Sequence, residues 1–202
     1  MHALERRVLD AIDDDALLRR LTDLVTYRSV GGAETPAQER MAAYMAAVGL
    51  DVDTWPLDLD RLRKHPAYTV DIERDDALGV TGRWGAGAGP TLILNGHIDV
   101  VPAGDETRWA YPPWEATVVD DRVYGRGTAD MKGALCCALA AIQALREAGA
   151  VLDGSVELQS VIGEEDGGLG TLAAVEHGSP ADAAIVMEPT ELMVAPAQAG
   201  AL

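Results

Sequence analysis

The 202-residue sequence has no phenylalanine, two lysines against fourteen arginines, and two cysteines. We attribute the missing phenylalanine and the excess of arginine to genome composition. Cys136 and Cys137 are adjacent and offer no disulfide framework, so we expect two buried thiols in a helix. No apolar run approaches the length that spans a membrane, and the first residues lack the apolar core of a secretion signal. We therefore expect a cytoplasmic protein.

Positive charge is also scarce, because 33 acidic residues outweigh 16 basic ones and leave a formal net charge of -17. This balance argues against nucleic acid or an anionic membrane as a partner. The length and the hydrophobic content of 48% suit one globular domain with a sizeable core.

Motifs of several catalytic classes are absent. The sequence has no His-Glu-x-x-His zinc-protease motif and no Gly-x-Ser-x-Gly nucleophile elbow. The glycine-rich stretch at 85–90 precedes a strand-like run, whereas a phosphate-binding loop follows a strand and opens a helix. We predict instead that this stretch is a hairpin connection between strands at 78–84 and 91–95.

Short apolar runs end abruptly in an imidazole or a carboxylate at several places in the chain. Such runs are typical of buried strands in an α/β sheet, where ligands bind at the carboxyl ends of the strands. The residues at or near these ends are His97, Asp99, Asp130, Glu164, Glu165 and Glu188. One imidazole among carboxylates indicates a site for a divalent cation such as zinc, with room for more than one ion.

Local spacing suggests how these side chains divide their work. His97 and Asp99 share one face of a strand, and a metal-bound histidine usually gives its other N–H to a carboxylate. Glu164 and Glu165 face apart on extended backbone, so one can bind metal while the other faces a water molecule. The other histidines lack an acidic partner at strand-end spacing, and we expect them on the surface or in linkers; they are His2, His65 and His177.

The remaining pattern predicts the order of the elements. We expect helices at 3–27 (a pair), 36–48, 131–148 and 169–177, a hairpin at 116–124, and strands at 155–162, 183–187 and near 192–197. The segment 55–76 has a mixed pattern that predicts no single helix or strand. This order predicts an α/β fold, a three-layer α/β/α sandwich around a mixed central sheet.

Four motifs hold these residues, from about Thr91 to Thr190: NGHIDVVP at 95–102, GRGTADMKG around Asp130, GEEDGG around Glu164 and Glu165, and MEPT around Glu188. Together they resemble the motifs of the acetylornithine deacetylase, succinyl-diaminopimelate desuccinylase and aminoacylase superfamily of dinuclear zinc hydrolases. The resemblance implies a zinc-exopeptidase-like fold and two zinc ions, with Co²⁺ or Mn²⁺ as possible substitutes. It also implies a role for each residue: His97 and Glu188 as ligands of one zinc, Asp130 as the bridging ligand, Glu165 as a ligand of the other zinc, Glu164 as the general base, and Asp99 as the carboxylate that orients His97.

The implied activity is hydrolysis of an amide bond in a small molecule, most simply deacylation of an N-acyl amino acid. An aminopeptidase or dipeptidase on the same scaffold, and a non-catalytic remnant that binds metal, are the alternatives. Members of this superfamily continue into a lid domain that commonly dimerises and then into a segment with the last zinc-binding histidine. We therefore expect residues 1–202 to be the N-terminal portion of a single catalytic domain, unable to dimerise through a lid and feebly active alone.

Overall fold

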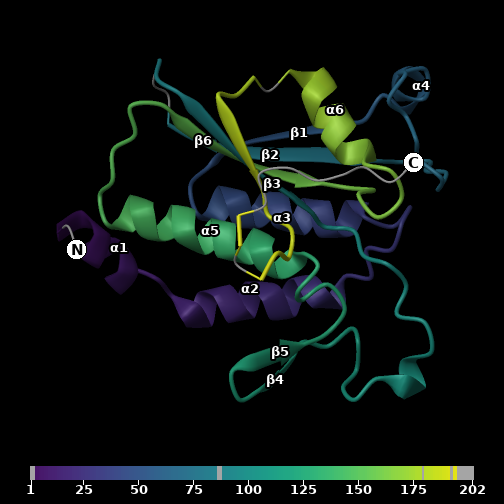
Figure 1. The fold of residues 1–202 in the computed structure, drawn as a ribbon, viewed down its shortest axis with the longest axis horizontal. Coiled ribbons are helices and arrows are strands. Elements are labelled where there is room, and N and C mark those ends of the chain that lie inside the picture. The colour runs from purple at the N-terminus through teal and green to yellow at the C-terminus, as the bar shows by residue number, and fades with distance from the viewer. Residues whose placement is uncertain (1–2, 86–87, 179, 192, 195–202) are drawn as a thin grey trace.

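A mixed five-stranded sheet organises the chain, in the order β1-β2-β6-β3-β7 (Figure 1). The computed structural model describes residues 3–85, 88–178, 180–191 and 193–194. β1 pairs antiparallel with β2, and β2 antiparallel with β6, whereas β6, β3 and β7 run parallel. The strands are β1 Asp51–Pro56, β2 Leu78–Trp84, β3 Thr91–His97, β6 Ser155–Val161 and β7 Ala183–Val186. The predicted α/β class with a mixed sheet is confirmed.

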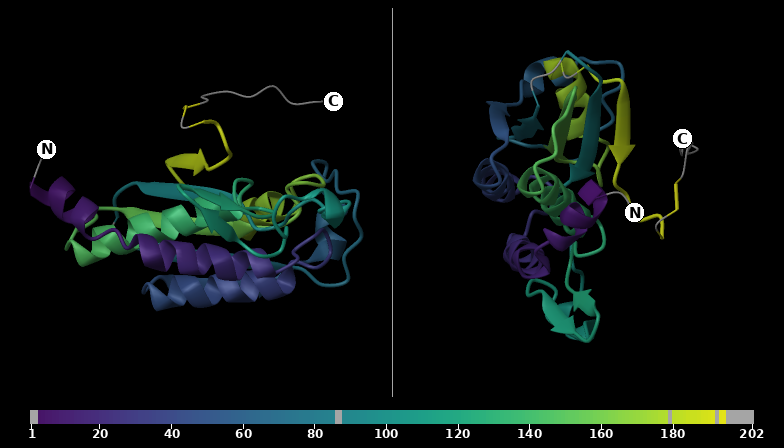
Figure 2. Two further views of the ribbon diagram at one scale, coloured as in Figure 1. Left: turned by 90° about the horizontal axis from the view of Figure 1, so that it is seen from below. Right: turned by 90° about the vertical axis from the view of Figure 1, so that its left-hand side faces the viewer.

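Helices cover both faces of the sheet (Figures 1 and 2). Adjacent residues of β6 show the two sides, since neighbours on a strand point to opposite faces. The Ser160 hydroxyl bonds to Gln38 of α3, while Val161 lies beneath Gly170 of α6. The helices are α1 Ala3–Asp10, α2 Asp14–Thr26, α3 Thr35–Ala47, α4 Leu59–Leu62, α5 Lys132–Glu147 and α6 Leu169–His177, with a short 3-10 turn at Glu106–Arg108.

Local sequence explains where the helices begin and which face they bury. The side chain of Asp13 caps α2 by accepting the backbone N–H of Ala16 at 2.8 Å. Leu24 of α2 and Leu135 and Leu139 of α5 are fully buried in the core, and burying each leucine contributes about 1.5–3 kcal/mol. Within the described part of the chain, no helix has the length and apolar character needed to cross a membrane.

The predicted hairpin between 78–84 and 91–95 is wrong, although both strands exist. β6 lies between β2 and β3, so the two strands are not neighbours in the sheet. The ends of the glycine stretch bond to the segment that leads into β6. Gly89 N–H donates to Asp153 O at 3.1 Å, and Ser155 N–H donates to Pro90 O at 3.0 Å. The chain does reverse between β2 and β3, but the connection passes across the start of β6, which separates the two strands.

Other differences concern the edges of the sheet. β1 was not predicted and reaches only the first two residues of the mixed segment 55–76, and α4 is a single turn within that segment. The predicted hairpin at 116–124 is present as β4 Thr117–Val119 and β5 Arg122–Tyr124, which project away from the sheet (Figures 1 and 2). Most of the strand predicted near 192–197 lies outside the described residues.

The two cysteines of α5 differ in exposure. Cys136 is buried and Cys137 is exposed, so the expectation of two buried thiols is wrong for Cys137. Consecutive helical residues lie about 100° apart around the axis, and the buried face of α5 that holds Leu135, Cys136 and Leu139 cannot also include Cys137. Burial raises the pKa of the Cys136 thiol to about 12.

This contrast predicts that the folded chain has one thiol that reacts readily with Ellman's reagent. Cys137→Ser is expected to abolish the fast reaction, because the remaining thiol is buried and protonated. Cys136→Ser is the matched control and should keep it. Two equally fast thiols in the folded wild-type chain would contradict the packing of α5.

Candidate metal centre

Three parallel strands bring the predicted site residues to one edge of the sheet. His97 is the last residue of β3, the central strand of the parallel group β6, β3 and β7. Glu164 and Glu165 follow β6, and Glu188 follows β7, so all three lie beyond the carboxyl ends of neighbours of β3. Asp130 lies in the turn that leads into α5. This is the edge at which parallel sheets bind ligands.

Carboxylates surround a single ring nitrogen of His97. Its Nε2 lies 3.0 Å from Oδ1 of Asp130, 3.8 Å from Oε2 of Glu188 and 3.9 Å from Oε2 of Glu164. The His97 side chain is 0% exposed, whereas those of Asp130 and Glu164 are 51% and 47% exposed. The imidazole is therefore the floor of a site whose rim is acidic and open to solvent.

Two sets of three side chains have ligand atoms that all lie within 4.8 Å of one another. His97 belongs to both: one set adds Glu164 and Glu188, and the other adds Asp130 and Glu165. The predicted set of His97, Asp130 and Glu188 is neither of these, although both carboxylates approach Nε2. Oxygen and nitrogen donors at about 2.0–2.2 Å from one zinc lie roughly 3–4 Å apart. The donors thus suit zinc in type, and the distances of 3.0–3.9 Å from Nε2 to the three carboxylates suit it in spacing.

Asp99 contacts the site differently from our expectation. The other ring nitrogen of His97, Nδ1, lies 2.9 Å from the backbone oxygen of Asp99, whereas its carboxylate Oδ1 is 3.6 Å away and too distant for a hydrogen bond. The buried carboxylate instead accepts the backbone N–H groups of Glu164 and Glu165 at 3.3 and 3.1 Å. Asp99 therefore joins the end of β3 to the loop after β6.

Charge accumulates around the imidazole. Burial lowers the pKa of His97, but the neighbouring Asp99 and Glu188 raise it more, to about 9. Burial, together with the nearby carboxylates, raises the pKa values of Glu165 and Glu188. His97 opposes both shifts, and a bound divalent cation would favour the ionised form of these carboxylates in the same way.

Lys132 is a residue of this region that sequence reasoning missed. It is fully buried, and its Nζ donates to the backbone oxygens of Leu24 and Tyr27 at 2.9 and 2.7 Å. Burial lowers its pKa to about 8. Lys132 thus anchors the turn that carries Asp130 to the end of α2. The available signal was its place two residues after Asp130 in a chain with two lysines.

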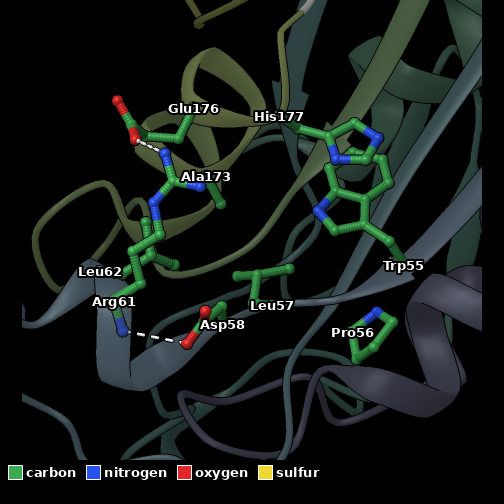
Figure 3. Close-up of a pocket in the computed structure, with 9 residues that line it drawn as sticks. All are labelled: Trp55, Pro56, Leu57, Asp58, Arg61, Leu62, Ala173, Glu176 and His177. Atoms are coloured by element: carbon green, nitrogen blue, oxygen red, sulfur yellow. Dashed lines mark hydrogen bonds and ion pairs between the residues drawn. The ribbon is translucent and has the colours of Figure 1, made fainter.

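A separate cavity of about 430 Å³ contains none of the predicted site residues (Figure 3). His177 stacks on Trp55 there, with ring centres 3.8 Å apart, and its Nε2 lies 2.9 Å from Asp53. His65 lies 3.7 Å from Glu176. These two histidines have acidic partners from distant segments. As expected, neither lies among the site residues around His97. His2 lies outside the described residues.

Comparison with known proteins relates the sequence of this chain to a peptidase family and to two named hydrolases. Residues 93–197 match the model of peptidase family M20/M25/M40. The chain is 29% identical to an N-formyl-4-amino-5-aminomethyl-2-methylpyrimidine deformylase of Bacillus subtilis, over 96% of the chain and 43% of the relative. It is 40% identical to a probable succinyl-diaminopimelate desuccinylase of Staphylococcus aureus, over 50% of the chain and 25% of the relative. The chain thus spans less than half the length of these relatives.

Solved structures agree on the fold. An M20 family metallo-carboxypeptidase from Sulfolobus solfataricus superposes with a TM-score of 0.64 at 21% identity, over 85% of this chain and 37% of that one. A tripeptidase from Staphylococcus aureus gives 0.64 at 24% identity, over 88% and 44%. At this identity the likeness shows the fold alone.

The contacts of Asp99 predict that its carboxylate supports metal binding indirectly, by holding the backbone of Glu164 and Glu165. Asp99→Asn is expected to lower the zinc affinity of the purified chain by about 10–100-fold, the usual cost of losing a partner behind the ligands. Asp13→Asn is the matched control, because Asp13 also accepts a backbone N–H but caps α2. Equal zinc affinity of Asp99→Asn and wild type, measured by chelator competition, would contradict this role.

Proposed function

The chain belongs to peptidase family M20/M25/M40, and from that premise we propose that it carries the metal-binding and proton-transfer residues of an amide hydrolase. The observation that carries the proposal is the convergence of three carboxylates within 3.9 Å of Nε2 of His97. One of them, Glu164, is available for proton transfer if the others bind metal.

We assign the metal ligands by the roles that the family resemblance implies for these residues. His97 and Glu188 would hold one zinc, Glu165 a second, and Asp130 would bridge the two. Bound zinc supplies two kinds of chemistry, a lowered pKa for a water molecule and polarisation of the amide carbonyl. Co²⁺ and Mn²⁺ are possible substitutes, because they accept the same nitrogen and oxygen donors.

Glu164 is the general base in this proposal. It is half exposed and lies above the buried imidazole. In our proposal its carboxylate takes a proton from the attacking water and returns that proton to the leaving amine. Asp99 holds the backbone of Glu164 and Glu165, so the proton-transfer group and its neighbouring ligand keep a fixed relation to His97.

Among amide substrates, we propose that the acyl group is small and that deacylation is the reaction. The relatives compared by sequence above are named a deformylase and a desuccinylase. The peptidases match through structures at 24% identity or less, which supports the fold and not the substrate. An N-acyl amino acid or a related acylated amine is therefore favoured over a peptide.

A substrate panel tests this proposal. The zinc-loaded chain should release amine from N-formyl, N-acetyl or N-succinyl substrates faster than it cleaves dipeptides, with Glu164→Gln as the inactive control. Faster cleavage of dipeptides would favour the peptidase alternative. Zinc binding without turnover of any panel member would favour the non-catalytic alternative.

Substitutions of Glu164 and Glu165 are predicted to have different effects on zinc content and turnover. Glu164→Gln should keep the zinc content and slow any turnover by about 10²–10⁴-fold, the usual cost of losing a general base. Glu165→Gln should lower the zinc content, because it removes a ligand. Metal analysis beside the same assay distinguishes them, and loss of zinc in Glu164→Gln alone would exchange the two roles.

Metal affinity is predicted to rise with pH. The metal-free chain holds a proton on His97 below a pKa of about 9, and zinc must displace that proton to reach Nε2. Between pH 6 and 8 the apparent zinc affinity should therefore rise about tenfold for each pH unit. An affinity that does not change over this range would show that His97 is not a ligand.

A further inference from the structure

Arg74 is buried in a stretch that is otherwise mostly exposed. Its residue exposure is 4%, whereas its neighbours Glu73 and Asp75 are exposed. Arginine is seldom buried unless it is paired. Arg74 is therefore the buried charged residue of the stretch between α4 and β2.

The guanidinium of Arg74 has a partner for every N–H. Nε and Nη2 donate to Oε1 of Glu34 at 3.1 and 2.6 Å, and Nη1 and Nη2 donate to the two carboxylate oxygens of Asp166 at 2.8 Å each. The remaining N–H of Nη1 donates to Ile72 O at 3.1 Å. The pair with Asp166 is bidentate, an arrangement that fixes orientation as well as distance.

Asp166 belongs to the same loop as Glu164 and Glu165. The stretch around Arg74 holds this loop at further points: the N–H of Ile72 donates to Oδ2 of Asp166 at 3.1 Å, and the hydroxyl of Thr69 donates to Gly167 O at 3.1 Å. These contacts hold Asp166 and Gly167, whereas Asp99 binds the N–H groups of Glu164 and Glu165 earlier in the same loop.

We propose that Arg74 is a positioning residue for the metal centre: by clamping Asp166, it holds the loop so that Glu164 and Glu165 face His97. The inference rests on the proposed metal centre. Asp99 and Arg74 hold different residues of the loop, and both are needed because a loop held at one point can still turn about that contact. Glu34 completes the charge balance of Arg74 but does not touch the loop.

Two matched substitutions separate positioning from simple stability. Asp166→Asn and Glu34→Gln each convert one carboxylate partner of the same guanidinium to an amide, and each leaves a buried ion pair incomplete. We expect both to lower the melting temperature. Only Asp166→Asn should lower the Co²⁺ affinity of the chain, by about 10–100-fold, and change the visible absorption of bound Co²⁺. Glu34→Gln should keep the affinity and spectrum of wild type.

The alternative outcomes are distinct. Equal Co²⁺ affinities and spectra for wild type and both variants, or equal losses in the two variants, would overturn the proposal. The cluster of Glu34, Arg74 and Asp166 would then serve stability alone. If Asp166→Asn does not fold, Arg74→Lys makes the same comparison, because lysine keeps the charge but loses the bidentate geometry, with Arg63→Met as the control for an exposed arginine. A wild-type chain that binds no Co²⁺ would contradict the proposed metal centre itself, and the role of Arg74 with it.

Discussion

Parallel pairing of β3 with β6 on one side and β7 on the other determines where the candidate ligands lie. The register places His97 beside Val161 and Asn95 beside Val186, so the chain leaves all three strands at nearly the same level. A shift of one residue in β3 would turn His97 to the opposite face. The convergence of residues that are far apart in sequence therefore depends on backbone pairing before any side chain contributes.

Electrostatics then gives that edge of the sheet its chemical character. The buried imidazole of His97 lies among carboxylates. The pKa of Glu165 is raised, and Asp99 is held by backbone N–H groups. This arrangement favours a bound cation. Buried polar contacts hold this arrangement in place. Asp99 joins β3 to the loop after β6, and Lys132 joins the Asp130 turn to α2. Arg74 joins the loop after β6 to the start of α3. The exposed carboxylates remain free to face a substrate because other groups hold their backbone.

Much of the fold and the candidate site could be predicted from the sequence, because the strand-end residues follow short apolar runs that local pattern reveals. The predictions failed where the partner is distant in sequence. The glycine stretch before Thr91 suggests a hairpin, and nothing near it signals that β6 will enter between the strands. Arg74 and Asp166 are 92 residues apart and Lys132 and Leu24 are 108 residues apart, so no local periodicity records either contact. The Asp99 contact was missed for a different reason: β3 ends at His97, and the strand spacing assumed for the pair ends there.

The central claim is that His97 lies at the base of a metal centre formed at the ends of β6, β3 and β7. A crystal structure of the zinc-loaded chain, with an anomalous map collected at the zinc edge, tests it most directly. The account predicts a peak within about 2.0–2.2 Å of Nε2 of His97, with carboxylate oxygens from Asp130 and Glu188 at similar distances. Zinc bound elsewhere, such as between His177 and Asp53, with no peak at His97, would contradict it.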